Sequence, residues 1–136
     1  MPEAAQRISV RIYYEDTDFS GRVYHASYLR FFERGRTEWL RAFGFEHASL
    51  MQSHGLAFAV TDLQLQFHAP AFIDDQLEVV TELTPPRGAR LLFRQNLFRT
   101  GALLVSGEIA VVTIKDNRAT RPPRELLGAL QAVTRR

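Results

Sequence analysis

The segment HASYLRFFERGRTEWLRAF, residues 25–43, decides the fold because its apolar residues recur with the period of an α-helix. Placed about 100° apart, they gather on one side of the helix, opposite Arg30, Arg34 and Arg41. That apolar side comprises Tyr28, Leu29, Phe31, Phe32, Gly35, Trp39, Leu40 and Phe43. It covers about half of the circumference, whereas a typical surface helix has an apolar stripe of roughly 100°. We therefore expect something curved, such as a curled sheet, to surround this helix.

Two residues of this helix need an explanation from the rest of the fold. Gly35 lies in mid-helix on the apolar side, where glycine costs about 1 kcal/mol relative to alanine. We expect a strand backbone to approach closely there. Arg36 projects near the same side, where its charge needs a partner or an exit to water. The sequence does not identify that partner.

Strand-like segments lie on both sides of the helix. Before it, residues 8–14 alternate, with one side formed by Ile8, Val10, Ile12 and Tyr14. After it, a short helix in residues 45–55 leads to four segments that resemble strands, namely residues 63–68, 77–83, 90–99 and 102–115. Residues 122–134 show helical spacing again and are predicted to form a C-terminal helix.

The links between the last four strands are short and carry turn residues: APAFIDD, PPRG and TG. Short links favour antiparallel neighbours, because a parallel crossover needs a dozen residues or more. We therefore predict an α+β fold in which residues 1–136 form one domain. A five-stranded antiparallel sheet, with its last four strands as a meander, wraps around the central helix. Trp39 is expected to lie in the hydrophobic core between this helix and the sheet.

The composition excludes several classes of function. The chain has 136 residues, of which 46% are hydrophobic and 24% charged, as in ordinary globular proteins. It has no cysteine, so disulfides, thiolate metal ligands and a cysteine nucleophile are excluded. A formal charge of +2 is too small to indicate a nucleic-acid partner. No secretory signal is visible. The longest apolar run is far too short for a membrane span, which takes about 20 residues. We predict a cytoplasmic protein without a cofactor.

The junction YYEDTDFSGRVYHASY, residues 13–28, concentrates polar groups between the first strand and the helix: Glu15, Asp16, Asp18 and His25. A calcium loop, a helix cap, a solvated acidic patch and an enzyme's acid–base groups are the four interpretations. The calcium interpretation requires a bidentate Glu at the twelfth loop position, which is Ser27. We therefore predict no metal. An acid or serine before a helix can also cap it, and this structural interpretation stays open.

The catalytic interpretation depends on physical proximity. A helix N-terminus offers unpaired N–H groups to an anion, and Tyr24, His25 and Ala26 occupy the expected first turn. A carboxylate six to eight residues upstream can reach the same point. Together these groups supply a nucleophile or general base and an oxyanion site, which are the two needs of acyl transfer.

Residues 13–41 resemble the 4-hydroxybenzoyl-CoA thioesterase family, in particular its branch of short-chain acyl-CoA thioesterases associated with the Tol–Pal system. The motif is T-D-x-x-G-x-V-Y-H-A-x-Y, followed by E-R-x-R-T-E. The resemblance implies a hotdog fold and metal-free hydrolysis of acyl-CoA in a homodimer or homotetramer. The same branch points to cell-envelope or lipid-synthesis proteins as partners.

The resemblance also implies roles for single residues. The catalytic aspartate corresponds to Asp18, the motif histidine to His25 and the tyrosine upstream of the acid to Tyr14. Asp16 is not the matching acid. Further candidates for substrate binding are Gly21, Arg22, Tyr24 and Ala26. Arg22 stands where the family usually has a branched aliphatic residue, so the acyl preference is open.

Outside the motif, Arg87 and Arg90 at a hairpin are candidates for contacts with CoA phosphates, although a solvated hairpin explains them equally well. His68 is expected to be structural. Two other functions remain as alternatives: a non-catalytic acyl-binding or scaffold module, and a hotdog hydratase. A scaffold needs none of Asp18, Gly21 and His25, so we favour the thioesterase.

Overall fold

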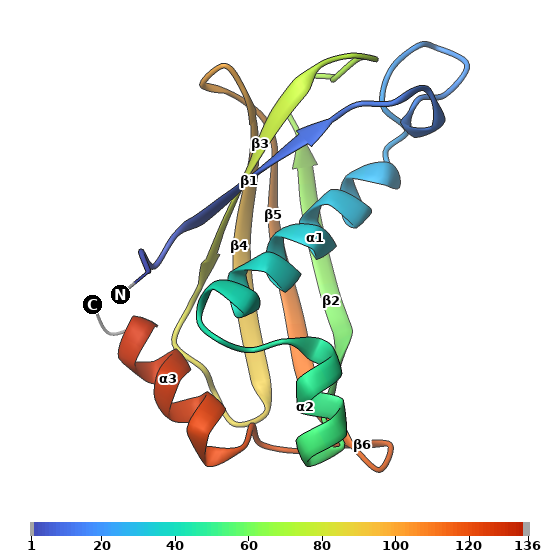
Figure 1. Cartoon of the computed structure of the whole chain (residues 1–136). Coiled ribbons are helices and arrows are strands. Elements are labelled where there is room, and N and C mark those ends of the chain that lie inside the picture. The colour runs from blue at the N-terminus through green and yellow to red at the C-terminus, as the bar shows by residue number, and fades with distance from the viewer. Residues whose placement is uncertain (1, 135–136) are drawn as a thin grey trace.

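The computed structural model describes residues 2–134, which form a single sheet with a long helix across one face (Figure 1). The elements in chain order are β1 (Gln6–Arg11), the 3₁₀ turn η1 (Tyr14–Asp16), α1 (Ser27–Ala42), α2 (His47–His54), β2 (Ala57–Phe67), β3 (Gln76–Leu83), β4 (Arg90–Arg99), β5 (Ala102–Lys115), β6 (Arg118–Ala119) and α3 (Arg124–Thr134). Five long strands pair antiparallel, and the short β6 folds back to pair antiparallel with the end of β5. The predicted α+β fold, with a five-stranded sheet around a central helix, is confirmed.

The predicted apolar side of α1 forms the centre of the core. Phe31, Phe32 and Trp39 are 0% exposed. Burying a side chain of this kind stabilises a fold by about 1.5–3 kcal/mol. The Trp39 ring meets Phe93 of β4 edge-on, with centroids 5.8 Å apart, and its Nε1 donates a hydrogen bond to the Ala4 carbonyl at 2.8 Å. Trp39 is therefore a core residue, and its polar atom is satisfied.

The order of the strands differs from the predicted meander. The sheet has the order β1-β3-β4-β5-β2, so β2 and β3 are not neighbours although they follow each other in the chain. The eight residues 68–75 connect them by crossing past the start of α1, where Ala71 accepts a hydrogen bond from the Val23 amide at 2.8 Å. Eight extended residues reach at most about 26–29 Å, which suffices because the curled sheet brings its sides together.

The first strand is shorter than predicted. It ends at Arg11, and Tyr14 lies in η1 with 82% of its surface exposed. The alternation continues through Ile12, which is fully buried and exchanges backbone hydrogen bonds with the 68–75 link: its N–H donates to Asp75 and its carbonyl accepts from Asp74, both at 2.9 Å. It ends where the chain enters η1, with Tyr13 as the N-cap. The placement of Tyr14 on the apolar side of a strand was wrong.

Gly35 faces two buried polar side chains, not a strand backbone as expected. A Cβ atom on Gly35 would lie 2.7 Å from Thr81 Oγ1 and 2.8 Å from Gln95 Nε2. Gln95 Nε2 donates to Thr81 Oγ1 at 2.9 Å and to the Phe32 carbonyl at 2.8 Å. Gln95 Oε1 accepts from Arg36 at 3.1 Å, which identifies the partner that the sequence could not assign. Burial lowers the pKa of Arg36 from its ordinary value.

The last helix, α3, lies within the range predicted for it and buries Leu126, Leu130 and Val133. In Figure 1 it lies beside the end of the sheet opposite to the start of α1. None of the helices in residues 2–134 is long and apolar enough to cross a membrane.

Replacing Gly35 with alanine should destabilise the protein, although alanine is the better helix former. The gain in helix propensity is about 1 kcal/mol. Forcing a methyl group against Thr81 and Gln95 should cost more, about 1–3 kcal/mol plus the disturbed hydrogen bonds. Gly128 in α3 is the matched control, because a Cβ there would meet nothing within 4 Å. Urea unfolding should show a loss for Gly35→Ala and a gain for Gly128→Ala; equal gains would contradict the packing argument.

Candidate active site

The loop between η1 and α1 folds into a tight turn that presents Asp18. Thr17 and Val23 form an isolated antiparallel bridge at its base. Within it, the Asp18 amide donates to the Arg22 carbonyl at 2.9 Å, and the Gly21 amide donates to the Asp18 carbonyl at 3.0 Å. Gly21 has a φ of 84°, a left-handed conformation that glycine adopts without steric cost. The motif glycine therefore makes the turn that holds the acid.

The Asp18 carboxylate is exposed and ionises readily. Its Oδ1 accepts hydrogen bonds from the Ser20 hydroxyl at 2.5 Å and the Ser20 amide at 2.8 Å. These bonds stabilise the charged form and lower the pKa of Asp18 from its ordinary value, with a further contribution from the Arg22 charge. Oδ2 accepts no hydrogen bond from residues 2–134, so it can contact a substrate or a water molecule.

The first turn of α1 lacks a side-chain cap. Its N-cap residue is Ala26, whose side chain makes no capping hydrogen bond. Within the described chain, the amides of His25 and Ala26 donate to no acceptor. The Tyr24 amide, by contrast, donates to the Asp16 carbonyl at 2.8 Å and is not open, and the substrate-binding role of Tyr24 stays a prediction. Two open amides and the helix dipole favour a negative charge at this point.

Asp18 and His25 line one open hollow with a volume of about 410 Å³. Its other lining residues are Ser20, Arg22, Val23, Tyr28, Phe67, His68, Ala69 and Pro70. The hollow thus combines an ionised acid, an arginine, imidazole groups and an apolar wall. It suits a ligand that carries both an apolar part and a polarisable carbonyl.

The sequence gives no sign of the far wall of the hollow. It consists of residues 67–70, where β2 ends and the crossing link begins. The Phe67 ring packs 5.7 Å from the ring of Tyr28. His68 Nε2 lies 3.0 Å from Ser106 Oγ, a contact that suits the structural role expected of it. Pro70 indicated a turn here, but nothing in the sequence indicated that the turn passes over the start of α1.

Several predicted site residues lie outside the hollow. Tyr14 is exposed, and its carbonyl accepts the Thr17 hydroxyl at 2.7 Å. Gly21, Tyr24 and Ala26 shape the loop but do not line the hollow. Arg87 and Arg90 line a separate hollow of about 280 Å³ with Arg94, at the β3–β4 hairpin. Figure 1 places that hairpin at the opposite end of the sheet from the start of α1. A single chain therefore does not bring the two arginines to Asp18.

The calcium interpretation finds no geometric support in this loop. Both carboxylate oxygens of Asp16, the first acid of the calcium-like stretch, accept hydrogen bonds from Tyr13 and Arg30. Ser27, at the twelfth position, contacts the same arginine. Within residues 2–134 there is no group of three or more His, Asp or Glu side chains that could hold a metal ion.

A long helix within a curled antiparallel sheet defines the hotdog fold, and the comparison with known sequences adds the class of protein. The sequence model of the thioesterase-like superfamily matches residues 12–130, and the chain belongs to this family. The resemblance seen in residues 13–41 is thereby confirmed, as is the class of enzyme, a thioester hydrolase.

Individual relatives agree with this assignment. The acyl-CoA thioesterase YbgC of Haemophilus influenzae is 45% identical over 122 residues, which cover 88% of this chain and 90% of the relative. The crystal structure of a probable thioesterase from Bartonella henselae, 37% identical, superposes with a TM-score of 0.85 and covers 88% of this chain and 100% of that one. A 4-hydroxybenzoyl-CoA thioesterase from Pseudomonas sp. strain CBS-3 has a TM-score of 0.87 at 18% identity, covering 93% and 99%, and shows the shared fold.

Replacing Ser20 with alanine should raise the pKa of Asp18. The variant loses the hydroxyl bond that contributes most to the lowered pKa, whereas Ser20→Thr keeps a hydroxyl and serves as the control. In an NMR titration of the side-chain carboxyl carbon, Asp18 should protonate at a higher pH in Ser20→Ala than in the parent or in Ser20→Thr. An unchanged midpoint in Ser20→Ala would show that the hydroxyl does not stabilise the carboxylate.

Proposed function

We propose that this protein hydrolyses acyl-CoA thioesters to the free acid and CoA, with Asp18 as the residue that breaks the thioester bond. The observation that carries the proposal is the ionised Asp18, whose Oδ2 is open, in one hollow with His25 beside the uncapped start of α1. The name of the Haemophilus influenzae relative, an acyl-CoA thioesterase, supports CoA as the leaving group.

Two routes through Asp18 lead to the same products. As a general base, Asp18 takes a proton from a water molecule while the water oxygen attacks the thioester carbon. As a nucleophile, its carboxylate attacks that carbon directly, and water then hydrolyses the resulting mixed anhydride. In both routes the C–S bond breaks and the CoA thiolate takes up a proton. The lowered pKa of Asp18 provides the unprotonated carboxylate that either route requires.

The start of α1 supplies the second requirement, which is stabilisation of the carbonyl oxygen. The open amides of His25 and Ala26 can donate hydrogen bonds to the negative charge that develops there. The His25 side chain orients the thioester or the water, or shares in the proton transfer. Its ring packs against the ring of Tyr24, with centroids 4.4 Å apart, which restricts its orientation.

We assign to Arg22 an influence on which acyl groups the protein prefers. It lines the hollow, and its guanidinium makes no hydrogen bond or ion pair with other residues of 2–134. A cation in this position favours acyl groups with a polar or anionic end. A scaffold or acyl-binding module does not require a carboxylate kept ionised beside open amides. A hotdog hydratase would use the same two groups, a base for water and donors for the carbonyl oxygen, and the thioesterase name of the Haemophilus influenzae relative favours hydrolysis over hydration.

Asp18→Asn should lower the turnover of acyl-CoA by about 10²–10⁴-fold or more, which is the loss typical of missing general base catalysis. Asparagine keeps the size of the side chain and an oxygen for the Ser20 hydrogen bonds, but it can neither attack as a carboxylate nor accept a proton from water. Release of free CoA should be measured over a series of acyl chain lengths. Folding should be unchanged, because the side chain is exposed.

Glu15→Gln is the matched control for this substitution. Glu15 is an exposed acid three residues upstream, and the same change from carboxylate to amide there should leave turnover unaltered. If Asp18→Asn retains parental turnover, the site assignment is wrong. If the parent binds acyl-CoA but hydrolyses no member of the series, the scaffold function replaces the thioesterase.

We further propose that the protein is a homodimer or a homotetramer. β2 forms an edge of the sheet, and residues 2–134 offer its outer side no partner strand. Its apolar side chains are exposed: Val60 by 51%, Leu63 by 45% and Phe67 by 53%. Native monomers rarely leave a long apolar edge open. We also propose that the protein acts in the cytoplasm, with cell-envelope or lipid-synthesis proteins as its partners.

Light scattering after size-exclusion chromatography should therefore give at least twice the chain mass of 15.6 kDa at micromolar concentration. A charged residue at Leu63, in the middle of the exposed edge, should shift the mass toward that of one chain. A parent protein that elutes as a stable 15.6 kDa monomer would contradict the proposal.

A further inference from the structure

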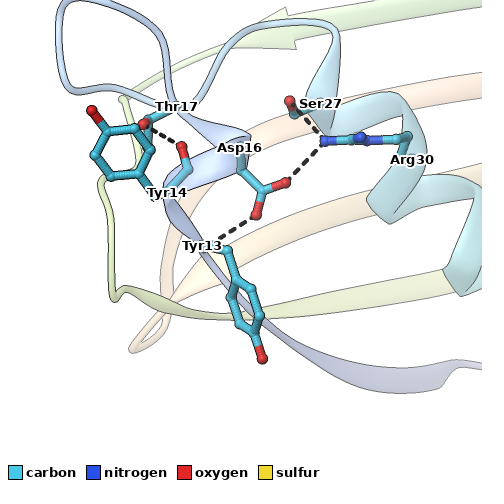
Figure 2. A network of polar contacts seen from close by, with 6 residues as sticks. All are labelled: Tyr13, Tyr14, Asp16, Thr17, Ser27 and Arg30. Atoms are coloured by element: carbon cyan, nitrogen blue, oxygen red, sulfur yellow. Dashed lines mark hydrogen bonds and ion pairs between the residues drawn. The ribbon is translucent and has the colours of Figure 1, made fainter.

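Asp16 is a buried acid to which the proposed reaction gives no role. It is 5% exposed, and Figure 2 shows that each of its carboxylate oxygens has its own partner. Oδ2 accepts a hydrogen bond from the Tyr13 amide at 2.9 Å, and Oδ1 accepts one from the Arg30 guanidinium, also at 2.9 Å. The same nitrogen of Arg30 lies 3.3 Å from Ser27 Oγ in the first turn of α1. One carboxylate thus connects the end of the first strand region with the start of the central helix.

The main chain of Asp16 connects the two halves of the candidate site. Its carbonyl accepts the Tyr24 amide at 2.8 Å, and Tyr24 directly precedes the open amides of His25 and Ala26. On its C-terminal side, Asp16 is followed by Thr17, the base of the turn, and then by Asp18. Movement of Asp16 would therefore change the distance between the Asp18 carboxylate and those amides.

We propose that the Asp16–Arg30 ion pair is a positioning device, which holds the Asp18 turn at a fixed place relative to the N-terminus of α1. The proposal rests on the function proposed for Asp18. The reaction requires the carboxylate and the open amides to meet the same thioester group, and a misplacement of about 1 Å can reduce a rate about 10²-fold. Asp16 acts only through Asp18 and the amides, and it does not contact the substrate.

Two substitutions disrupt the ion pair, one at each of its residues. Asp16→Asn keeps the shape of the side chain but places an amide –NH₂ against a donor, either the Tyr13 N–H or the Arg30 guanidinium. Arg30→Gln removes the cation, whose side chain is 55% exposed, so this variant should fold even if Asp16→Asn does not. Arg34→Gln is the matched control, because Arg34 is an exposed arginine one turn further along α1.

The experiment compares kcat, KM and the melting temperature of these variants with an acyl-CoA that the parent hydrolyses. For Asp16→Asn and Arg30→Gln, kcat should fall about 10–100-fold because the reacting groups are misplaced. KM should change by less than about threefold, because the contacts with CoA are unaffected. Arg34→Gln should have the kcat and KM of the parent.

The same substitutions in the Asp18→Asn background separate positioning from general stability. Single-turnover rates should show no further loss when Asp16→Asn or Arg30→Gln is added, because the group that they position is already inactive. Rates that fall again by the full factor of the single variants, or single variants with parental kcat, would overturn the positioning role while leaving the function of Asp18 intact. Parental turnover of Asp18→Asn would overturn both.

Discussion

The burial of one side of α1 against the curled sheet is the constraint on which the rest of this structure depends. Phe31, Phe32 and Trp39 fill the space enclosed by the strands, and Gly35 lets the helix approach the buried pair Thr81 and Gln95. These contacts fix the helix along its whole length, so its N-terminus has one position relative to the sheet. The site lies at that N-terminus. Its geometry is therefore a consequence of core packing far from the reacting groups.

The sequence predicted the elements of this fold better than their order. The wide apolar side of residues 25–43 indicated a surrounding sheet, because a 3.6-residue period shows directly which side is buried. The pairing of β2 with β5 was not predictable in the same way. A link such as residues 68–75 is long enough for a hairpin and also for a crossing over a helix end, and its composition is the same in both cases.

The candidate site was predicted in part. The motif located Asp18 and His25, and the structure brings both to one hollow, although their catalytic roles stay predictions. Residues 67–70 could not be predicted as its far wall, because their position depends on the strand order. The partner of Arg36 could not be predicted either, because Gln95 is 59 positions away and only the folded sheet brings it close to the helix. Local patterns identify which residues need a partner, and tertiary structure decides which partner they find.

The crossing link also couples the site to the global folding transition. The turn that carries Asp18 and the wall formed by residues 67–70 are about 50 positions apart, so the hollow requires closure of a long loop before it exists. It therefore appears only when β2 has joined β5 and the chain has returned to β3. Within a single chain β2 has a neighbouring strand on one side only, and local opening of its end would remove a wall of the hollow. A ligand bound there would in turn suppress that opening, so occupancy of the site and order at the sheet edge rise and fall together.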